Sequence, residues 1–553
     1  MWILGLNRTH DAAITLMKDN EVVLHLQEER LTHEKHCCEA IKLIEIVKKY
    51  TTEIDILVYS YLYNKQYDFS VYIKLFEYAG INIKLISNFS ELHHLAHASS
   101  AFNNSQFKTA ACVIIDGAGS DLEYGKENES IFHALGPNKI MCVYKSIVGS
   151  QKEITNSNIP NYVNKTPKIG AGMVYSAVTE YLGFSNHDCG KTMGLSSYGK
   201  DDPRIKPMLL KTGGNPELFE IRSTDQTVVF YENNHAKFKE YDYIFYSKSE
   251  EDQFLKLSNL SYKLQKEFEE YVYNLIILSL ELTGEKNIVL GGGCALNCVA
   301  NYNILKRLPP EINLYVDPVC GDDGISMGSA KYQYKIDLNK DCSLKSLYLG
   351  QNIDYNYSIE KNEKELEVTP KEVSKLILDG NIVSIAQGKS EAGPRALGNR
   401  SILFDPRSKN GKDIVNRVKK REWWRPFAGT VLLEYARDWF DMDRLEESPF
   451  MMYAVDVLKE KRELIPAITH VDGTCRIQTL KKEQNPNYYE LIEEFYQLTG
   501  VPILFNTSFN LAGDTIVETI DDAFNTLRNS EIEYMYLPEI KKLIYVPNEK
   551  SIC

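Results

Sequence analysis

The sequence predicts an α/β protein of two domains. Apolar strand patterns alternate with helical patterns along most of the chain, and several strands end in acidic or glycine-rich turns that lead into helices. A polar stretch without helical or strand periodicity, residues 348–365, separates residues 1–347 from residues 366–553. We therefore expect one domain on each side of a linker at 348–365. No internal sequence repeat is recognisable.

Composition narrows the class of protein. The chain has 553 residues, of which 43% are hydrophobic and 25% charged, which is typical of a globular protein. The formal net charge of −13 argues against a nucleic-acid or anionic membrane partner. The start, "MWILGLNRTHDAA", lacks the basic and apolar regions of a signal peptide, and no apolar run is long enough for a membrane span. These features predict a cytoplasmic protein.

The first elements are predicted to form an antiparallel meander. "WILGLN", "AAITLMKD" and "EVVLHLQEERL" read as strands, and the first bend between them carries His10. Further along, "TAACVIIDGAGS", "KNIVLGGGCALNCVANYNIL" and "LYVDPVCGDDGISMGSAKY" each begin with a strand that ends in an acidic or glycine turn. Helices follow the last two of these turns.

Backbone N–H groups at such turns bind phosphate, so the repeated pattern favours a nucleotide site in the first domain. We also expect "HDCGKTMGLSSYGK", residues 187–200, to be a glycine-punctuated loop. The candidate nucleotide-binding residues of this domain are Gly291, Gly292, Gly293, Asn297 and Lys191. The alternative is that these turns are ordinary connections of an α/β sheet.

The stretch "ELHHLAHASSAF" suggests a metal site. On a helix, His93 and His97 would share a face, with His94 turned aside. Asp116 ends a strand and Asp322 lies in the turn before a helix, so both carboxylates belong to the sheet edge where ligands bind. Two imidazoles and two carboxylates suit a divalent metal, and the set resembles the facial ligands of Fe(II) sites. Fe(II) is favoured, Zn and Mn remain open, and the alternative is a solvated helix end beside two turn aspartates.

The second domain is rich in residues that bind anions. Arginine and lysine side chains pair with phosphate oxygens, and here they cluster beside glycine, proline and aromatic residues in a chain that is acidic overall. A strand that ends in Asn506, Thr507 and Ser508 adds polar groups. This pattern predicts a phosphorylated substrate. The cluster comprises Lys389, Arg395, Arg400, Arg407, Lys419, Lys420, Arg421, Arg425, His470 and Arg476.

Long motifs give the chain a family resemblance. "HHLAH", "IIDGAGS", "TMGLSSYGK", "GGGCALN" and "CGDDGISMG" resemble the N-terminal domain of the O-carbamoyltransferases that include NodU nodulation proteins and antibiotic-tailoring enzymes. "EAGPRALGNRSIL", "KKREWWRPFA" and "ILFNTSFN" are similar to their C-terminal domain. The resemblance runs in order over nearly the whole chain. It implies an actin/Hsp70-like (ASKHA) two-lobed first domain, akin to the threonylcarbamoyl-adenosine synthase subunit, and a YrdC-like second domain.

The resemblance also implies a mechanism. The second domain would make carbamoyl-adenylate from carbamoyl phosphate and Mg-ATP, and the first would transfer the carbamoyl group to a hydroxyl of a small natural product such as an antibiotic. It carries over the metal ligands His93, His97, Asp116 and Asp322, the base His10, and the carbamoyl phosphate and nucleotide contacts Arg395, Arg476, Asn506 and Ser508. The family's KxRExxRPFAP motif falls on Lys419, Arg421 and Arg425, with Lys420 in place of a Tyr and Gly429 in place of the final Pro.

Two other functions stay open at this stage. A tRNA-modifying enzyme that transfers threonylcarbamoyl to adenosine would use the same two chemistries, although its RNA-facing surface should be basic. A catalytically silent nucleotide-binding sensor is the second. The sequence does not specify the acceptor, and the segment that we expect to shape its pocket is residues 145–170.

Overall fold

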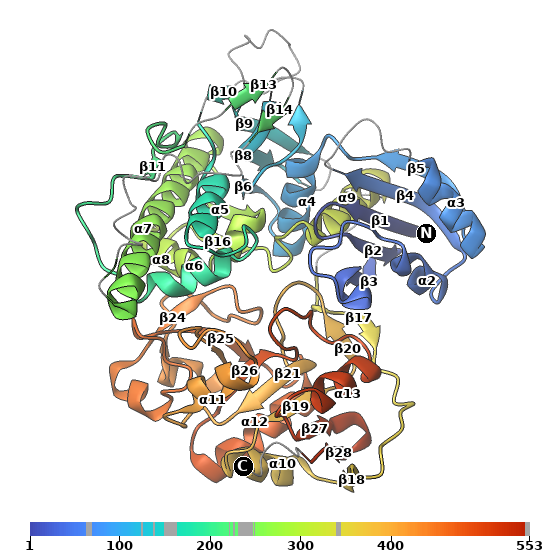
Figure 1. Cartoon of the computed structure of the whole chain (residues 1–553). Helices are drawn as coiled ribbons and strands as arrows, with labels where there is room; N and C mark the ends of the chain where they lie inside the picture. Colours follow the sequence, from blue (N-terminus) through green and yellow to red (C-terminus); the bar gives the residue numbers. More distant parts are fainter. Residues whose placement is uncertain are drawn as a thin grey trace. The chain divides into compact units, whose positions relative to one another are not determined.

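The computed structural model describes residues 1–61, 69–122, 125–136, 139–148, 163–166, 168–219, 222–224, 227–229, 247, 249–338 and 344–547 (Figure 1). Most of the segment expected to shape the acceptor pocket therefore lies outside the described residues. The chain divides into two compact units. Unit 1 comprises Met1–Val23 and Cys37–Leu344, and unit 2 comprises Leu24–His36 and Lys345–Cys553. A short N-terminal segment thus belongs with the second half of the chain.

The first sheet of unit 1 has the strand order β3-β2-β1-β4-β5. β1 pairs antiparallel with β2 and parallel with β4, which in turn pairs parallel with β5. The predicted N-terminal meander is thereby confirmed. The bounds are β1 Trp2–Arg8, β2 Ala13–Lys18, β3 Glu21–Gln27, β4 Glu53–Tyr61 and β5 Asn82–Asn88, with helices α2 Lys42–Lys48 and α3 Ser70–Ala79. The short helix α1 (Glu29–Thr32) and the second half of β3 lie in the segment that belongs to unit 2.

The second sheet of unit 1 repeats this topology without any sequence repeat. Its path is β10-β9-β8-β6-β15-β16, in which β9, β8 and β6 are antiparallel and β15 and β16 follow in parallel. The bounds are β6 Ala110–Ile115, β8 Gly125–Ala134, β9 Ile140–Val148, β10 Val163–Thr166, β15 Asn287–Gly291 and β16 Asn313–Val316, with β7 Asp121–Leu122 beside β8. Two sheets of one topology make the two-lobed, actin/Hsp70-like arrangement that was expected.

Two helices connect the lobes of unit 1. α9 (Asp323–Leu338) packs on β1, β2 and β4 of the first sheet, and α4 (His93–Ser105) packs on β6 and β15 of the second. The two helices also pack against each other, as Figure 1 shows. They approach so closely that a Cβ on Gly328 would lie 1.9 Å from the carbonyl oxygen of Ala96. Small residues on both helices allow this contact.

The remaining helices of unit 1 gather around the long α7 (Glu250–Thr283), which packs on β6 of the second sheet. They are α5 (Ala171–Tyr181), α6 (Cys189–Ser196) and α8 (Cys298–Arg307), with short strand pairs β11 Leu209–Leu210 with β12 Gly213–Gly214, and β13 Arg222–Thr224 with β14 Thr227–Val229. The prediction that residues 187–200 form a loop was wrong, because α6 occupies much of it. The helix forms despite its glycines since Thr192 and Leu195 are buried and α6 packs against α7.

Unit 2 is built on one mixed sheet of strand order β18-β28-β27-β19-β21-β26-β22-β25-β24-β23. Its strands are β18 Lys364–Glu367, β19 Val383–Ala386, β21 Arg400–Phe404, β22 Ala428–Leu432, β23 Phe440–Asp441, β24 Ala454–Val457, β25 Thr474–Leu480, β26 Ile503–Ser508, β27 Tyr534–Leu537 and β28 Lys542–Tyr545. The α/β class is confirmed here too. α10 (Pro370–Leu378), α11 (Gly411–Val418), α12 (Pro486–Thr499) and α13 (Ile520–Arg528) accompany the sheet.

Two smaller features bear on the predictions. The stretch expected to be a linker contains β17 (Tyr348–Asn352), which pairs with β20 (Lys389–Glu391) inside unit 2. α10 carries a capping box, in which the Thr369 hydroxyl accepts from the Glu372 N–H and the Glu372 carboxylate accepts from the Thr369 N–H. Within the described residues, no helix is long and apolar enough to cross a membrane.

Candidate functional site

Unit 1 gathers four potential metal ligands in its core. His93 and His97 lie on the first two turns of α4, Asp116 follows β6, and Asp322 immediately precedes α9. Each offers one ligand atom, and the four atoms all lie within 4.8 Å of one another. All four residues are buried. The structure therefore brings together the four residues that the sequence singled out.

The spacing of these atoms fits a single ion. The two histidine Nε2 atoms are 3.2 Å apart, and the Asp116 Oδ2 lies 2.9 Å from the His93 Nε2 and 3.5 Å from the His97 Nε2. The Asp322 Oδ1 lies 3.6 and 3.7 Å from the same two nitrogens. Ligands that each bind one ion at about 2.1 Å lie about 3 to 3.4 Å from one another. Two neutral imidazoles and two carboxylates are also a suitable donor set for a divalent metal.

The pKa values of the clustered residues also favour a bound cation. Burial alone would lower the pKa of His97, but the hydrogen bonds and charges of Asp116 and Asp322 raise it to about 10. Burial would raise the pKa of Asp116, but the two histidines hold it well below its usual range. Without an ion, His97 binds a proton, whose positive charge partly balances the two buried carboxylates. A divalent cation would supply that positive charge instead.

Backbone and amide groups fix the two aspartates. The Asp116 Oδ1 accepts from the N–H groups of Gly117 and Gly293, at 2.8 and 3.2 Å, which leaves Oδ2 to face the histidines. The Asn7 amide donates to the carbonyl oxygen of Asp322, at 2.7 Å. Sequence reasoning did not identify Asn7, because only the tertiary fold brings β1 beside the turn before α9.

His94 takes no part in the cluster, as predicted from the helical spacing. Its Nδ1 lies 2.8 Å from the Ser130 hydroxyl on β8, and the side chain is fully buried. Burial lowers the pKa of His94 to about 4, so its ring is neutral at physiological pH. His94 therefore belongs to the core of the second lobe.

His10 stands beside the cluster. Its Nε2 lies 3.6 Å from the Asp322 Oδ2, and its Nδ1 lies 2.8 Å from the Asp11 carboxylate. Burial opposes its protonation, but the charge of Asp322 and the hydrogen bond to Asp11 raise its pKa to about 10. Side-chain exposure of 38% leaves the ring accessible to a substrate. A cation bound by Asp322 would counter the charge that keeps His10 protonated.

The glycine run after β15 supports the cluster as well. Gly292 has φ +83°, and a Cβ there would lie 2.3 Å from the Ile115 carbonyl oxygen, so only glycine fits beside β6. Asn297 caps α8 by accepting from the Ala300 N–H at 3.0 Å, and its amide also donates to Gln265 on α7. Lys191 on α6 pairs with Asp188 at 3.1 Å.

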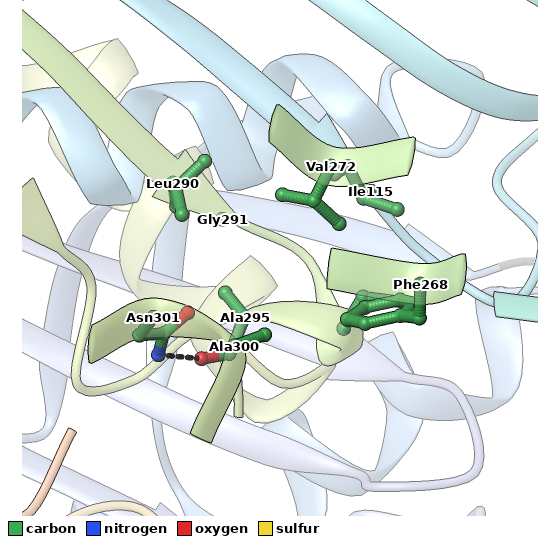
Figure 2. Close-up of a pocket in the computed structure, with 9 residues that line it drawn as sticks. Ile115, Phe268, Val272, Leu290, Gly291, Ala295, Ala300 and Asn301 are labelled. Atoms are coloured by element: carbon green, nitrogen blue, oxygen red, sulfur yellow. Dashed lines mark hydrogen bonds between the residues drawn. The ribbon is translucent and has the colours of Figure 1, made fainter. Parts of the chain in front are cut away.

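Behind the glycine run lies a small, mostly apolar pocket (Figure 2). The Asn301 amide faces it but donates to the Ala295 carbonyl oxygen at 2.8 Å. The remaining lining offers few polar groups to a phosphate, so the pocket itself is unsuited to that group. Its lining residues are Ile115, Phe268, Val272, Leu290, Gly291, Cys294, Ala295, Ala300 and Asn301.

Unit 2 holds a cluster of cationic side chains. Burial, together with the neighbouring positive charges of Arg425 and Arg476, holds the pKa of Arg421 well below its usual range. Arg421 donates to Asn416 at 2.6 Å and lies over the Phe427 ring, which orients its guanidinium. Mutual repulsion among buried cations is unfavourable unless an anion neutralises them. The cluster therefore has the charge of a phosphate site.

Arg476 has the clearest capacity to bind a ligand. It lies on β25 opposite Ala428, half-buried, and its Nε is fully buried. Among the described residues, no group accepts a hydrogen bond from its guanidinium. A half-buried arginine normally finds a carboxylate or carbonyl partner, so this side chain is arranged for an acceptor outside the described protein.

Lys419 is buried, and oxygen atoms of the protein hold its ammonium group. Its ammonium donates to the Ser508 carbonyl oxygen at 2.5 Å, and to the carbonyl and side-chain oxygens of Asn510 at 2.9 Å each. Burial, followed by the charges of Arg421 and Arg425, holds its pKa well below the usual range. Lys419 thus joins the end of α11 to Ser508, the last residue of β26, and to Asn510 in the turn that follows.

Unit 2 also contains the remaining residues that the sequence suggested for substrate binding. Asn506 on β26 is fully buried and donates to Thr430 at 3.0 Å. His470 lies 2.9 Å from the Phe427 carbonyl oxygen, and burial lowers its pKa. Arg395 projects half-buried from the loop between β20 and β21. Arg425 lies 3.6 Å from Glu422.

Comparison with known proteins identifies the family. Residues 42–331 match the family description "Carbamoyltransferase N-terminus", and residues 374–542 match "Carbamoyltransferase C-terminus". The chain belongs to the carbamoyltransferase family. Nodulation protein NolNO of Sinorhizobium fredii is 31% identical over 98% of this chain and 80% of its own length. The family membership makes this chain a transferase.

One further relative and one solved structure are similar to parts of the chain. The 3'-hydroxymethylcephem-O-carbamoyltransferase of Streptomyces clavuligerus is 32% identical over 46% of this chain and 48% of its own length. Among solved structures, full-length HypF in its phosphate- and nucleotide-bound form is 18% identical, with a TM-score of 0.36 over 62% of this chain and 56% of that one.

Proposed function

We propose that this carbamoyltransferase is an ATP-dependent O-carbamoyltransferase. Unit 2 makes carbamoyl-adenylate from carbamoyl phosphate and Mg-ATP, and unit 1 transfers the carbamoyl group to a hydroxyl of a small natural product. The observation that carries the proposal is Arg476, a half-buried guanidinium without a protein acceptor in the described chain, beside the buried cation Arg421. Such a pair suits a phosphorylated substrate.

In unit 2, the side chains bind and orient the anion. Arg421, Arg425 and Arg476 surround the phosphate, and their charges attract carbamoyl phosphate into a site where each arginine repels the others. Lys419 keeps the Ser508 turn in place through its bonds to Ser508 and Asn510. The negative charge of the phosphate offsets the repulsion among the three arginines, so the site is more stable with the substrate bound than empty.

In unit 1, the buried cluster of two histidines and two aspartates is proposed to hold a divalent metal, with Fe(II) favoured. A metal bound there would polarise the carbamoyl oxygen as a Lewis acid. His10 receives the proton of the acceptor hydroxyl at its Nε2, and Asp11 holds the ring orientation through Nδ1. Removal of that proton makes the hydroxyl oxygen a nucleophile for the carbamoyl carbon.

The test is a pair of product measurements on the full chain. Incubated with carbamoyl phosphate and Mg-ATP, without RNA, the protein should release phosphate and pyrophosphate and form carbamoyl-AMP, which mass spectrometry detects. Addition of a hydroxylated acceptor, such as a hydroxymethylcephem, should then yield a carbamoylated product. Absence of both phosphate and pyrophosphate from metal-loaded protein would contradict the proposal. Carbamoyl transfer only when tRNA is supplied would favour a tRNA-modifying enzyme.

A further inference from the structure

The loop between β20 and β21, residues 392–399, has an unusually well-defined backbone for a segment without regular structure. Gly393 and Gly398 both have positive φ, at +79° and +109°. A Cβ on Gly398 would lie 2.1 Å from the Tyr488 ring, so this position requires glycine. Apart from Pro394 and Arg395, the loop residues are buried. The loop therefore presents Arg395 from a fixed backbone.

One side of the loop is fastened by Glu391. A single carboxylate oxygen, Oε1, accepts from the backbone N–H groups of Leu397, Asn399 and Arg400, at 2.7, 2.8 and 3.2 Å. Glu391 is 3% exposed, so these bonds are shielded from water. Three donors that converge on one buried anion fix the end of the loop that enters β21.

The other side is fastened by Arg30, which comes from the N-terminal segment that belongs to unit 2. Its Nη2 donates to the Gly393 carbonyl oxygen at 2.8 Å, two residues before Arg395. Arg30 is 2% exposed, and within the described chain its Nε and Nη1 have no hydrogen-bond partner. Such incomplete use of a buried guanidinium is costly.

Arg400 shows what a purely structural arginine looks like in this unit. It is equally buried, but its guanidinium donates to carbonyl oxygens of Gln387, Asn399, Gly388 and Glu518, at 2.5 to 3.2 Å. Arg30 makes only its bond to Gly393 among the described residues. The bond to Gly393 is therefore the contact through which the Arg30 guanidinium acts on the loop.

We propose that Arg30 and Glu391 are positioning residues for Arg395, which contacts a phosphate oxygen of the substrate. This inference rests on the proposed function of unit 2. Glu391 fixes the exit of the loop, and Arg30 fixes its entry, so Arg395 meets the phosphate without a cost of ordering the loop. The N-terminal segment thereby contributes to anion binding in unit 2. The phosphate belongs either to carbamoyl phosphate or to ATP.

The experiment measures KM for carbamoyl phosphate and for ATP separately, by pyrophosphate release from the full chain. Arg30→Met and Glu391→Ala should raise the KM of one substrate by about tenfold, because each leaves Arg395 loosely held. The substrate whose KM rises is the source of the phosphate. Arg30→Lys and Glu391→Gln, which keep a donor and an acceptor, should largely restore it. Glu363→Gln is the matched control, since Glu363 is a buried carboxylate of the same unit that pairs instead with Arg528 at 2.7 Å.

A second arm separates positioning from general damage. Arg395→Ala alone should raise the same KM, and adding Arg30→Met to it should raise that KM no further, because the two changes act through one contact. Unchanged KM values in folded Arg30→Met, or full additivity with Arg395→Ala, would overturn the inference. If Arg30→Met and Glu391→Ala do not fold, Arg30→Gln, whose shorter side chain weakens the bond to Gly393, replaces Arg30→Met in the same additivity test. A wild-type chain that releases no pyrophosphate contradicts the proposed function instead.

Discussion

The Nε2 atoms of His93 and His97 lie 3.2 Å apart, one helical turn from each other on α4, and both face the carboxylates of Asp116 and Asp322. Neither ring can relax away, because both histidines are 1% exposed. Two buried nitrogens this close, beside two buried acids, are stable only with a shared positive charge. The proposals for unit 1 follow from this contact.

His97→Ala should abolish stoichiometric metal binding. The change removes one of four ligands and leaves a site too open to hold an ion tightly. Protein loaded anaerobically with Fe(II), and separately with Zn or Mn, is analysed for metal per chain. His94→Gln is the control on the same helix, and it should keep its metal because His94 bonds to Ser130 instead. Full metal in folded His97→Ala would contradict the assignment.

Arg476→Ala and Arg425→Ala should weaken the use of carbamoyl phosphate. Losing one charge-assisted hydrogen bond costs about 1.5–3 kcal/mol, which corresponds to a roughly ten- to hundredfold higher KM. Steady-state phosphate release measures the effect. The control is Arg528→Ala, since Arg528 is paired with Glu363 away from the cluster. An unchanged KM and turnover in both cluster variants would place the anion site elsewhere.

The division of labour between units predicts opposite phenotypes for two variants. His10→Ala should still release phosphate and pyrophosphate, yet transfer carbamoyl at least about a hundredfold more slowly, because general-base help is lost. Lys419→Met should fail at adenylate formation, since the Ser508 turn loses its ammonium, but should still transfer from supplied carbamoyl-adenylate. Parallel loss of both activities in both variants, with circular dichroism unchanged, would indicate one composite site.

Local periodicity explains which parts of the site the sequence predicted. The spacing of His93 and His97 follows from helical geometry, and Asp116 ends an apolar strand, so both were recognisable without tertiary information. The bonds of Lys419 to Ser508 and Asn510, and the bond of Arg30 to Gly393, depend on contacts between distant segments, which no local pattern encodes. The repeated sheet topology of unit 1 was hidden for the same reason, since strand order is not a sequence repeat.

The missed helix α6 has a different cause. Its residues include Gly190 and Gly194, which weaken a helix intrinsically and favoured a loop in the prediction. The structure places Thr192 in the core, where its hydroxyl lies 2.8 Å from that of Thr179 on α5. Tertiary packing against α5 and α7 thus outweighs the glycine propensity.

Gly328→Ala should destabilise unit 1 strongly. The new Cβ would lie 1.9 Å from the Ala96 carbonyl oxygen, and backbone cannot yield as a flexible side chain can. Overpacking of this kind costs about 1–3 kcal/mol or more. Gly190→Ala on α6 is the matched control, because a Cβ there meets nothing within 4 Å, and it should stabilise the helix by about 0.5–1 kcal/mol. Urea denaturation compares the two, and equal stability of Gly328→Ala and wild type would refute the close approach of α4 and α9.

Two buried glutamates on β8 should give opposite dependences of stability on pH. Burial raises the pKa of Glu129 from 4.5 to about 7. The hydrogen bond that its carboxylate accepts from the Ala171 N–H opposes this rise but does not cancel it. Burial would also raise the pKa of Glu127, but the charges of His94 and Lys145 and the hydrogen bonds from Lys145 and Ser120 lower it to about 2. Both are 1% exposed, so screening by solvent is small.

The direction of each pH dependence follows from whether the folded protein favours the protonated or the ionised form of the glutamate. Glu129 contributes its full stability below pH 4.5, in the protonated form, and loses it as the pH rises to about 7. Glu127 contributes above pH 4.5 and loses its contribution only as the pH falls toward about 2. Glu129→Gln should therefore gain stability relative to wild type between pH 5 and 8, by about a few kcal/mol. Glu127→Gln should be less stable by a constant amount over that range. Denaturation at three or more pH values measures both differences, and a pH-independent difference for Glu129→Gln would show that Glu129 is ionised in the fold.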